Sequence, residues 1–409
     1  MKCLINSKEG DGLQEKENNK IRVHCMLACL YFLLLPTTIV VNAFGSSLLK
    51  LAAIPIAISI VITIMVTKSL LKFNYVHLFL LIYTFSTAIT LFVSSSDVAI
   101  DYVVGYFLNA GLFICLSLLE YNERELKLLE NVQVWMLVII VALTLFSNGT
   151  RAGRTTLEIF GQTTDPNYFV GFFIFPLVIT MKKIIQSKYR LLYIILAALS
   201  IYCVFLSGSR GGLLAVVATL VAFALMYPAK MKNKLLLTAA GFAFVICAWF
   251  ALRPFLPEII VERMSLQSVL ETGGTYRADI WVSMTKEIIS SPGELIFGRG
   301  IAAMHNIFIN GSWEEVVAHN QLIQVLYNQG AVGLISFLLL IIVAFMRCSG
   351  RRKTVAIAII GMMVLSISLS FNQTTRTFWN LIAYAAFAFP ENKKPTSEGK
   401  TKLSEESSI

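Results

Sequence analysis

The chain alternates between long stretches without charged residues and short polar segments. Twelve stretches contain no Asp, Glu, Lys or Arg, and most reach the roughly 17–25 residues that a helix needs to cross the hydrocarbon core of a bilayer. They are residues 23–49, 51–67, 73–96, 102–119, 131–150, 166–181, 191–209, 211–229, 235–252, 316–346, 354–375 and 377–390. Backbone polar groups in hydrocarbon must be paired within their own segment, which a helix achieves. The pattern therefore predicts an all-α polytopic membrane protein with about 12 transmembrane helices.

The polar segments divide this helical chain into five regions. We expect a disordered cytoplasmic N-terminus (1–22), spans 1–9 (23–252), a long extracytoplasmic loop between spans 9 and 10 (253–318), spans 10–12 (319–390) and a disordered cytoplasmic tail (391–409). Long structured loops tend to carry function, and the other connections between spans are short. The loop is therefore the first place to look for a site.

One amphipathic helix is predicted inside this loop. In TYRADIWVSMTKEIISSP, Ile280, Met284 and Ile288 recur at helical spacing, and Pro292 ends the pattern. Such a helix lies in the plane of a membrane surface with its apolar face turned inward. We expect it along the outer surface.

Composition agrees with a membrane protein and explains the net charge. The chain is 56% hydrophobic and 14% charged, with a mean hydropathy of +0.72, which excludes an ordinary soluble domain. Its net charge of +10 is one that nucleic-acid-binding proteins often have. With the N-terminus inside, however, most Lys and Arg fall in predicted cytoplasmic segments, as membrane topology requires. The net charge is thus explained by the membrane topology, and no nucleic-acid partner is predicted. Both termini are expected in the cytoplasm.

Ten basic residues remain on the predicted outer side, and eight of them are Arg. They are Lys50, Arg151, Arg154, Arg210, Arg253, Arg263, Arg277, Lys286, Arg299 and Arg376. A planar guanidinium binds phosphate through paired hydrogen bonds, which Lys cannot do. The set therefore indicates a phosphate-bearing ligand, the alternative being that each residue only anchors lipid headgroups.

Arg210 has the most informative surroundings. In LSGSRGGLLAVV a short turn joins two predicted spans, and Ser209 can cap the helix that follows. Gly211 and Gly212 let a ligand approach the backbone, and the helix N-terminus adds its positive end to the guanidinium. An anion site at the outer surface is predicted, and the alternative is a tight turn with a lipid anchor.

Two histidines are candidates for a general base. His319 opens span 10 in AHNQLIQVLYNQGAVGL, beside Asn320, and His305 repeats the His-Asn pair in the preceding loop. A neutral imidazole can accept the proton of a hydroxyl near neutral pH. We favour His319, because its place at the start of a span fixes it more firmly, and keep His305 as its competitor.

A second group of candidates precedes span 6, in NGTRAGRTTLEIFGQTTDPNYF. Arg151 and Arg154, with Asp165 and Asn167 at the mouth of the span, could complete the anion site. The alternative is a surface loop in which Pro166 begins a helix. Arg299, Asn320 and Arg376 are further candidates for substrate binding.

These motifs together resemble the O-antigen ligase and polysaccharide polymerase superfamily. The resemblance rests on SGSRGGLLA, TTDPNYF, YRADIW followed by FGRGI, and AHNQLIQVLYNQGAVGLISF, in this order. It implies a bacterial inner-membrane glycosyltransferase of the C type (GT-C), which moves an oligosaccharide from undecaprenyl diphosphate to an acceptor hydroxyl on the outer face. By the resemblance, Arg210 and Arg277 match the arginines at the diphosphate and His319 the histidine at the acceptor.

The implied reaction leaves several alternatives open. Single-step displacement would invert the anomeric carbon, and no cofactor or metal is expected. Asp97 and Asp101, one helical turn apart, are the best alternative site if a metal takes part. A polymerase that extends a carrier-linked repeat is favoured over a ligase that acts on an acceptor such as lipid A-core. A transporter or flippase of lipid-linked sugars is the alternative from another class.

Overall fold

The fold comes from a computed structural model. It describes residues 21–40, 48–67, 71–93, 97–147, 149–227, 241, 243, 245–265, 267–268, 276–302, 304–350, 352–371 and 375–388. The disorder expected at residues 1–22 and 391–409 falls outside these ranges, apart from residues 21 and 22, which the structure describes.

Each predicted span overlaps a helix in the part of the chain that the structure describes. These helices are α2 (Val23–Leu33), α3 (Leu48–Thr67), α4 (Tyr75–Ile89), α5 (Asp97–Ser117), α6 (Glu123–Phe146), α7 (Pro166–Gln186), α8 (Arg190–Leu206), α9 (Arg210–Met226), a helix over Val245–Phe255, α15 (Gln321–Ser349), α16 (Lys353–Ser366) and α17 (Arg376–Ala386). Among the described residues, six helices are long and apolar enough to cross a membrane, and they include α3 to α7 and α15. The all-α, polytopic membrane character is confirmed.

The remaining elements are short. They comprise the 3₁₀-helices η1 (Leu35–Ile39), η2 (Thr90–Phe92) and η3 (Arg253–Phe255), and the helices α11 (Glu258–Met264), α13 (Arg277–Ile289) and α14 (Pro292–Phe297). The strands are β1 (Thr150–Arg151), β2 (Arg154–Thr155), β3 (Glu158–Ile159), β4 (Gln162–Thr163), β5 (His305–Ile309) and β6 (Ser312–Val316). The amphipathic helix predicted in the loop is therefore present as α13. It buries Ile280, Met284 and Ile288 as expected, and Pro292 begins α14.

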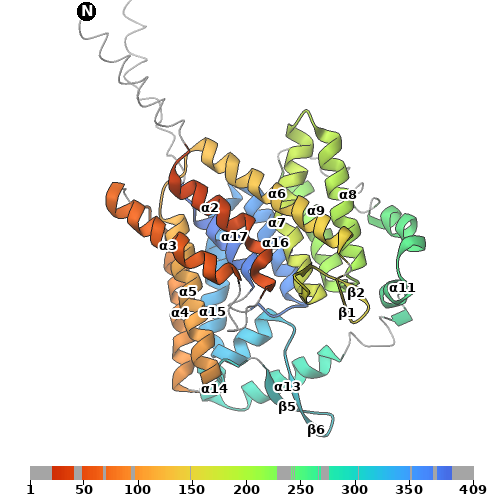
Figure 1. Cartoon of the computed structure of the whole chain (residues 1–409). Helices are drawn as coiled ribbons and strands as arrows, with labels where there is room; N and C mark the ends of the chain where they lie inside the picture. Colours follow the sequence, from red (N-terminus) through yellow and green to blue (C-terminus); the bar gives the residue numbers. More distant parts are fainter. Residues whose placement is uncertain are drawn as a thin grey trace, which may run out of the picture.

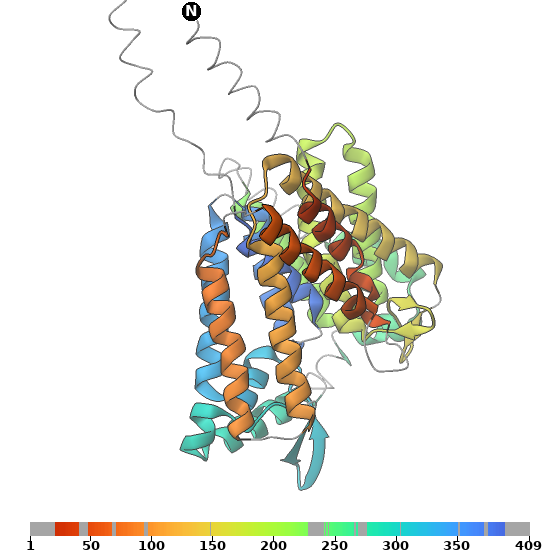
Figure 2. The same ribbon diagram turned by 60° about the vertical axis from the view of Figure 1, so that its left-hand side comes forward.

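The strands form three antiparallel hairpins that the sequence analysis did not anticipate. Each has a two-residue turn with both residues at positive φ, as in Ala152–Gly153 and Asn310–Gly311. Such turns match the twist of the paired strands. Figure 1 shows α13, α14 and the β5–β6 hairpin gathered at one end of the bundle. The hairpin projects from that end in Figure 2, and we call it the hairpin end.

A break in α15 lets the loop pack against it. Gly330 has φ 63° and ψ −163°, a conformation open to glycine, and a Cβ there would lie 2.3 Å from the Ile296 carbonyl oxygen. The carbonyl groups that the break releases accept hydrogen bonds from the loop: Arg299 N to Tyr327 O at 2.9 Å and Gly300 N to Asn328 O at 3.1 Å. Two of the motifs behind the family resemblance, FGRGI and YNQG, thus contact each other.

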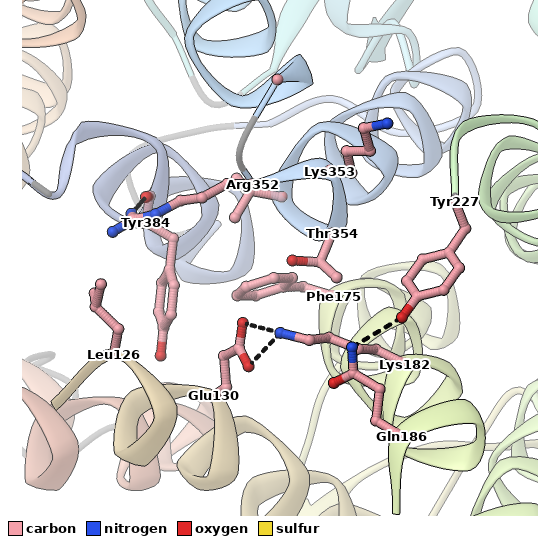
Figure 3. Close-up of a pocket in the computed structure, with 12 residues that line it drawn as sticks. Leu126, Glu130, Phe175, Lys182, Gln186, Tyr227, Arg352, Lys353, Thr354 and Tyr384 are labelled. Atoms are coloured by element: carbon pink, nitrogen blue, oxygen red, sulfur yellow. Dashed lines mark hydrogen bonds and ion pairs between the residues drawn. The ribbon is translucent and has the colours of Figure 1, made fainter. Parts of the chain in front are cut away.

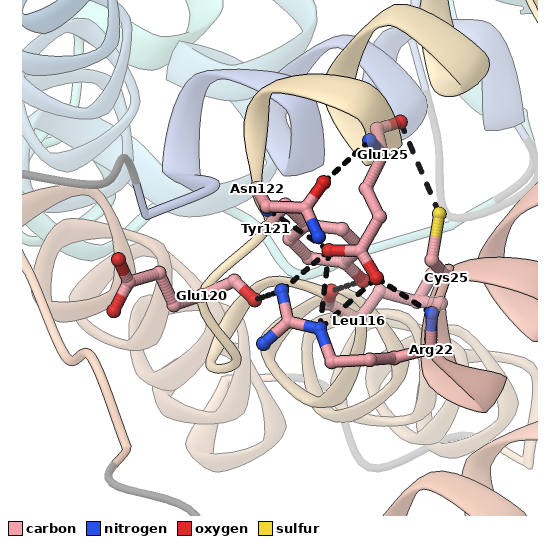
Figure 4. A network of polar contacts seen from close by, with 7 residues as sticks. All are labelled: Arg22, Cys25, Leu116, Glu120, Tyr121, Asn122 and Glu125. Carbon is pink, nitrogen blue, oxygen red and sulfur yellow. Dashed lines mark hydrogen bonds and ion pairs between the residues drawn. The ribbon is translucent and has the colours of Figure 1, made fainter. Parts of the chain in front are cut away.

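At the opposite end, a polar network joins the starts of α2 and α6 (Figure 4). Asn122 and Glu125 cap α6 reciprocally, so the helix begins at Glu123, earlier than the uncharged stretch that predicted it. Glu125 is fully buried, and its carboxylate also accepts from the Arg22 backbone at 2.8 Å and from the Arg22 guanidinium. Arg22 in turn donates to the Glu120 carbonyl. The buried charge is therefore paired, as burial requires.

Candidate functional site

The start of α9 is built to pack closely. Ser209 caps the helix by accepting from Gly212 N at 3.1 Å. A Cβ on Gly211 would lie 1.8 Å from Ser368 Oγ in the segment after α16. The missing Cβ of Gly211 allows that approach, so the helix N-terminus and Arg210 lie close to Ser368.

Asn167 connects this helix start to the predicted residues before α7. Asp165 caps α7 by accepting from Asn167 N at 2.8 Å. The Asn167 side-chain oxygen accepts from Ser209 Oγ at 2.8 Å and from Arg154 Nη2 at 3.2 Å. Arg154 is buried, and its Nε donates to the Ser207 carbonyl at 2.7 Å. The mouths of α7 and α9 thus share one polar network.

Arg263, on α11, completes the contacts around Arg210. Arg210 Nε donates to the Arg263 carbonyl at 2.7 Å, and Arg210 Nη2 to Ser268 Oγ at 2.8 Å. Arg263 Nε donates to the Gly208 carbonyl at 3.1 Å. The side chain of each arginine therefore binds a backbone carbonyl in the segment that carries the other arginine.

Arg277 begins α13 and reaches the same region. Its Nη1 donates to the Ser368 carbonyl at 3.2 Å. Ser368 is also the residue that Gly211 approaches, so Arg277 lies near the start of α9. We call Arg154, Arg210, Arg263 and Arg277 the arginine cluster.

Burial and mutual repulsion act on the arginine cluster. Burial first, and then the charge of Arg263, lowers the pKa of Arg154 to about 10. The same two causes, in the same order, lower the pKa of Arg277. Asp165 is the acidic group that opposes both shifts. Like charges gathered in this way are stabilised when an anion binds between them.

His319 lies within the field of this cluster. Burial, followed by the charge of Arg277, lowers the pKa of the half-buried His319 imidazole, and Asp165 opposes the shift. Its backbone has φ 49°, a left-handed conformation that is unusual for a non-glycine residue. The lowered pKa favours the neutral imidazole, which is the state that a general base requires.

The residues on either side hold His319 in this conformation. Ala318 N donates to the Gln324 side-chain oxygen at 3.0 Å, and the Ala318 carbonyl accepts from Trp281 on α13 at 2.7 Å. Asn320 caps α15 by accepting from Leu322 N at 3.0 Å. Asn320, predicted to bind substrate, thus has a helix-capping role in the structure.

The competing histidine, His305, lies beside Arg299, and Asn328 and Gln324 link it to the backbone next to His319. His305 Nε2 is 2.7 Å from the Asn328 side-chain oxygen, and its ring packs edge-on against Tyr327. Arg299 forms ion pairs with Glu287 and Glu294 and donates to the Tyr327 hydroxyl at 3.0 Å. Through these contacts Arg299 connects α13, α14 and α15.

The remaining candidates lie at the edge of the cluster or away from it. Arg151 is exposed on β1 and faces Arg154 across the β1–β2 hairpin. Arg376 is buried at the start of α17, next to the Tyr31 hydroxyl, and its Nε has no hydrogen-bond partner among the described residues. The alternative acidic pair, Asp97 and Asp101, is exposed at the start of α5. Across the described ranges, no three His, Cys, Asp or Glu side chains gather as metal ligands.

Three residues of the site escaped the sequence reasoning. Arg263 was counted among the outer basic residues but not singled out. Gln324 and Ser368 lie in uncharged stretches; Gln324 accepts from both Ala318 N and Ser370 Oγ, the latter at 3.3 Å. Gln321, Gln324 and Asn328 share one face of α15 in an otherwise apolar span, a signal that pointed to a buried polar network.

Comparison with known protein families identifies part of the chain. Residues 195–338 match the family model described as O-antigen ligase. The matched range includes Arg210, Arg263, Arg277 and His319, whereas Arg154, Asp165, Asn167 and Ser368 lie outside it. No curated protein matches the chain. The match at residues 195–338 therefore supports the resemblance to the O-antigen ligase and polysaccharide polymerase superfamily.

Proposed function

We infer that the protein is an inverting glycosyltransferase that takes an oligosaccharide from undecaprenyl diphosphate and joins it to an acceptor hydroxyl. The observation that supports this most strongly is the gathering of Arg154, Arg210 and Arg277 around the starts of α7, α9 and α13, with His319 in the field of Arg277. A diphosphate leaving group and a hydroxyl nucleophile need these two kinds of group side by side.

In the proposed reaction, His319 accepts the proton of the acceptor hydroxyl as its oxygen attacks the anomeric carbon. The bond from that carbon to the diphosphate breaks, and the carrier leaves as undecaprenyl diphosphate. Guanidinium groups stabilise the departing charge by about 1.5–3 kcal/mol per charge-assisted hydrogen bond. The base contributes about 10²–10⁴-fold in rate. The step is metal-independent and inverts the anomeric configuration.

The proposed topology has twelve spans in a GT-C-like arrangement. Residues 23–252 form spans 1–9 and residues 319–390 spans 10–12, with both termini in the cytoplasm. Residues 253–318 and the hairpin end then face outward from the bacterial inner membrane. The arginine cluster lies at the starts of helices, at the depth of lipid headgroups. That position favours surface chemistry over transport, because a transporter concentrates its charges near the middle of the membrane.

Within this class we favour a surface polysaccharide polymerase. A ligase that acts on lipid A-core or another terminal acceptor is the second candidate, which the description of the matched family favours. Gel analysis of the glycan made by the purified protein distinguishes them. A ladder of repeats supports the polymerase, whereas a single shifted acceptor band supports the ligase.

A further inference from the structure

A cavity of about 350 Å³ lies between α6, α7, α16 and α17 (Figure 3). That volume is within the range of small-ligand sites, about 300–1,000 Å³. Lys182, Arg352 and Lys353 line it together with one acid, Glu130, and its remaining walls include Phe175 and Tyr384. Basic groups therefore exceed acidic ones around a partly apolar space.

The cavity and the arginine cluster lie at opposite ends of the same helices. On α7, Asn167 in the cluster and Lys182 at the cavity are 15 residues apart, or about 22 Å at 1.5 Å per residue. On α16, Lys353 is the first residue, and Ser368, which binds Arg277, follows the last turn. This separation is comparable to the roughly 30 Å thickness of a hydrocarbon core. The cavity is thus at the headgroup level of the leaflet opposite the arginine cluster.

The polar groups of the cavity are held in place. Lys182 Nζ contacts both carboxylate oxygens of Glu130, at 2.8 and 2.7 Å, and Gln186 donates to the Tyr227 hydroxyl at 3.0 Å. Arg352 Nη1 donates to the Tyr384 carbonyl at 2.6 Å. Lys353 begins α16, whose N-terminus adds a partial positive charge. The site is therefore preformed and favours an anion.

We propose that this cavity binds the phosphate headgroup of an anionic phospholipid in that leaflet. Basic pockets between helices at a membrane surface bind such headgroups, and each basic residue contributes attraction. The apolar rings of Phe175 and Tyr384 suit the glycerol and the first carbons of the chains. On the proposed topology the leaflet is the cytoplasmic one. The proposal depends on the membrane-spanning bundle and not on the transferase reaction.

Native mass spectrometry of the full chain in detergent tests this proposal, with phosphatidylglycerol and phosphatidylcholine as lipid probes and inorganic phosphate as a soluble one. We expect phosphatidylglycerol to bind more tightly than phosphatidylcholine. Lys353→Gln should weaken phosphatidylglycerol binding about fivefold, the loss expected for one basic residue near a membrane surface. Lys188→Gln is the matched control, because Lys188 is exposed beyond the end of α7 and does not line the cavity. It should leave binding unchanged.

Glu130→Gln gives a second and opposite readout. It removes the carboxylate that Lys182 contacts, so phosphatidylglycerol should bind more tightly than in the wild type. A purely structural ion pair predicts no gain in affinity. Equal losses in Lys353→Gln and Lys188→Gln, or no gain in Glu130→Gln, would overturn the proposal. Binding of inorganic phosphate without phosphatidylglycerol would overturn the assignment to a lipid.

Discussion

The charge of Arg277 acts on His319. The positive charge opposes protonation of the imidazole and, after burial, is the second cause of its lowered pKa. Arg277→Gln removes this opposition, so the pKa of His319 rises and less of it is neutral at a given pH. We therefore predict that the acidic limb of the kcat/KM profile moves to higher pH in Arg277→Gln.

Arg277→Lys is the control for this prediction, because it keeps the charge and should leave the acidic limb near its wild-type position, whatever the loss of rate. The profile of kcat/KM reports the free enzyme, so the shift can be read without bound donor. An acidic limb that stays in place in both variants would mean that His319 is not the titrating base.

Arg210 makes the most demanding use of the guanidinium geometry. Its Nε and Nη2 bind two different protein groups, the Arg263 carbonyl and Ser268 Oγ. An ammonium group cannot keep both bonds and also face a diphosphate. We predict that Arg210→Lys lowers the transfer rate about 10- to 100-fold, since a charge-assisted hydrogen bond contributes about 1.5–3 kcal/mol.

The matched control is Arg190→Lys, in which an exposed arginine at the start of α8 is changed in the same way. Its rate should equal that of the wild type in the same assay. If Arg210→Lys turned over as fast as Arg190→Lys, Arg210 would be an anchor for headgroups and nothing more.

Residue types and positions in the sequence were enough to nominate Arg154, Arg210 and His319, because outward arginines and a histidine at a helix start depart from ordinary membrane patterns. The sequence could not show that Gln324 holds the backbone next to His319, or that Ser368 receives Arg277. These contacts join segments up to 91 residues apart, and hydropathy carries no information about such pairs. Arg299 was predicted to bind substrate, but its local sequence did not reveal the two carboxylates with which it forms ion pairs.

At the level of elements, the break in α15 can be tested directly by substitution. We predict that Gly330→Ala destabilises the protein by at least about 1–3 kcal/mol, the typical cost of a strained backbone conformation, because alanine must adopt φ 63° and approach the Ile296 carbonyl. The measurement is the thermal unfolding midpoint in detergent, which should fall by several degrees.

Gly293→Ala provides the comparison. Gly293 lies in α14, and a Cβ there meets no atom within 4 Å, so its unfolding midpoint should match that of the wild type. Equal unfolding midpoints for Gly330→Ala and Gly293→Ala would show that alanine at position 330 does not destabilise the protein.

The elements themselves were predictable to different degrees. Uncharged length located the helices of the spans, and apolar spacing located α13, because both signals are local. The β5–β6 hairpin was missed although Asn310–Gly311 is the dipeptide that most favours a two-residue turn. The break at Gly330 has no local signal of its own, since it depends on the loop that packs against it.

At the scale of the whole molecule, the bundle separates two charged regions along its axis. The arginine cluster, with His319, lies near the starts of α7, α9 and α13, and the basic cavity lies toward the end of α7. Apolar helices connect them, and the buried polar residues of α15 lie between its broken turn and the cluster. The arrangement suits a protein that binds phosphate at both surfaces of a membrane and does chemistry at one of them.

We propose that the arginine cluster binds a lipid diphosphate while His319 activates the acceptor. The most direct test of this proposal uses purified protein in liposomes with an undecaprenyl-diphosphate-linked oligosaccharide and measures new glycosidic bonds. We predict that the wild type forms bonds and releases undecaprenyl diphosphate, and that His319→Ala is folded and inserted but at least about 10²-fold slower. Wild-type rates in His319→Ala, or sugar that crosses the bilayer without any new bond, would contradict the account.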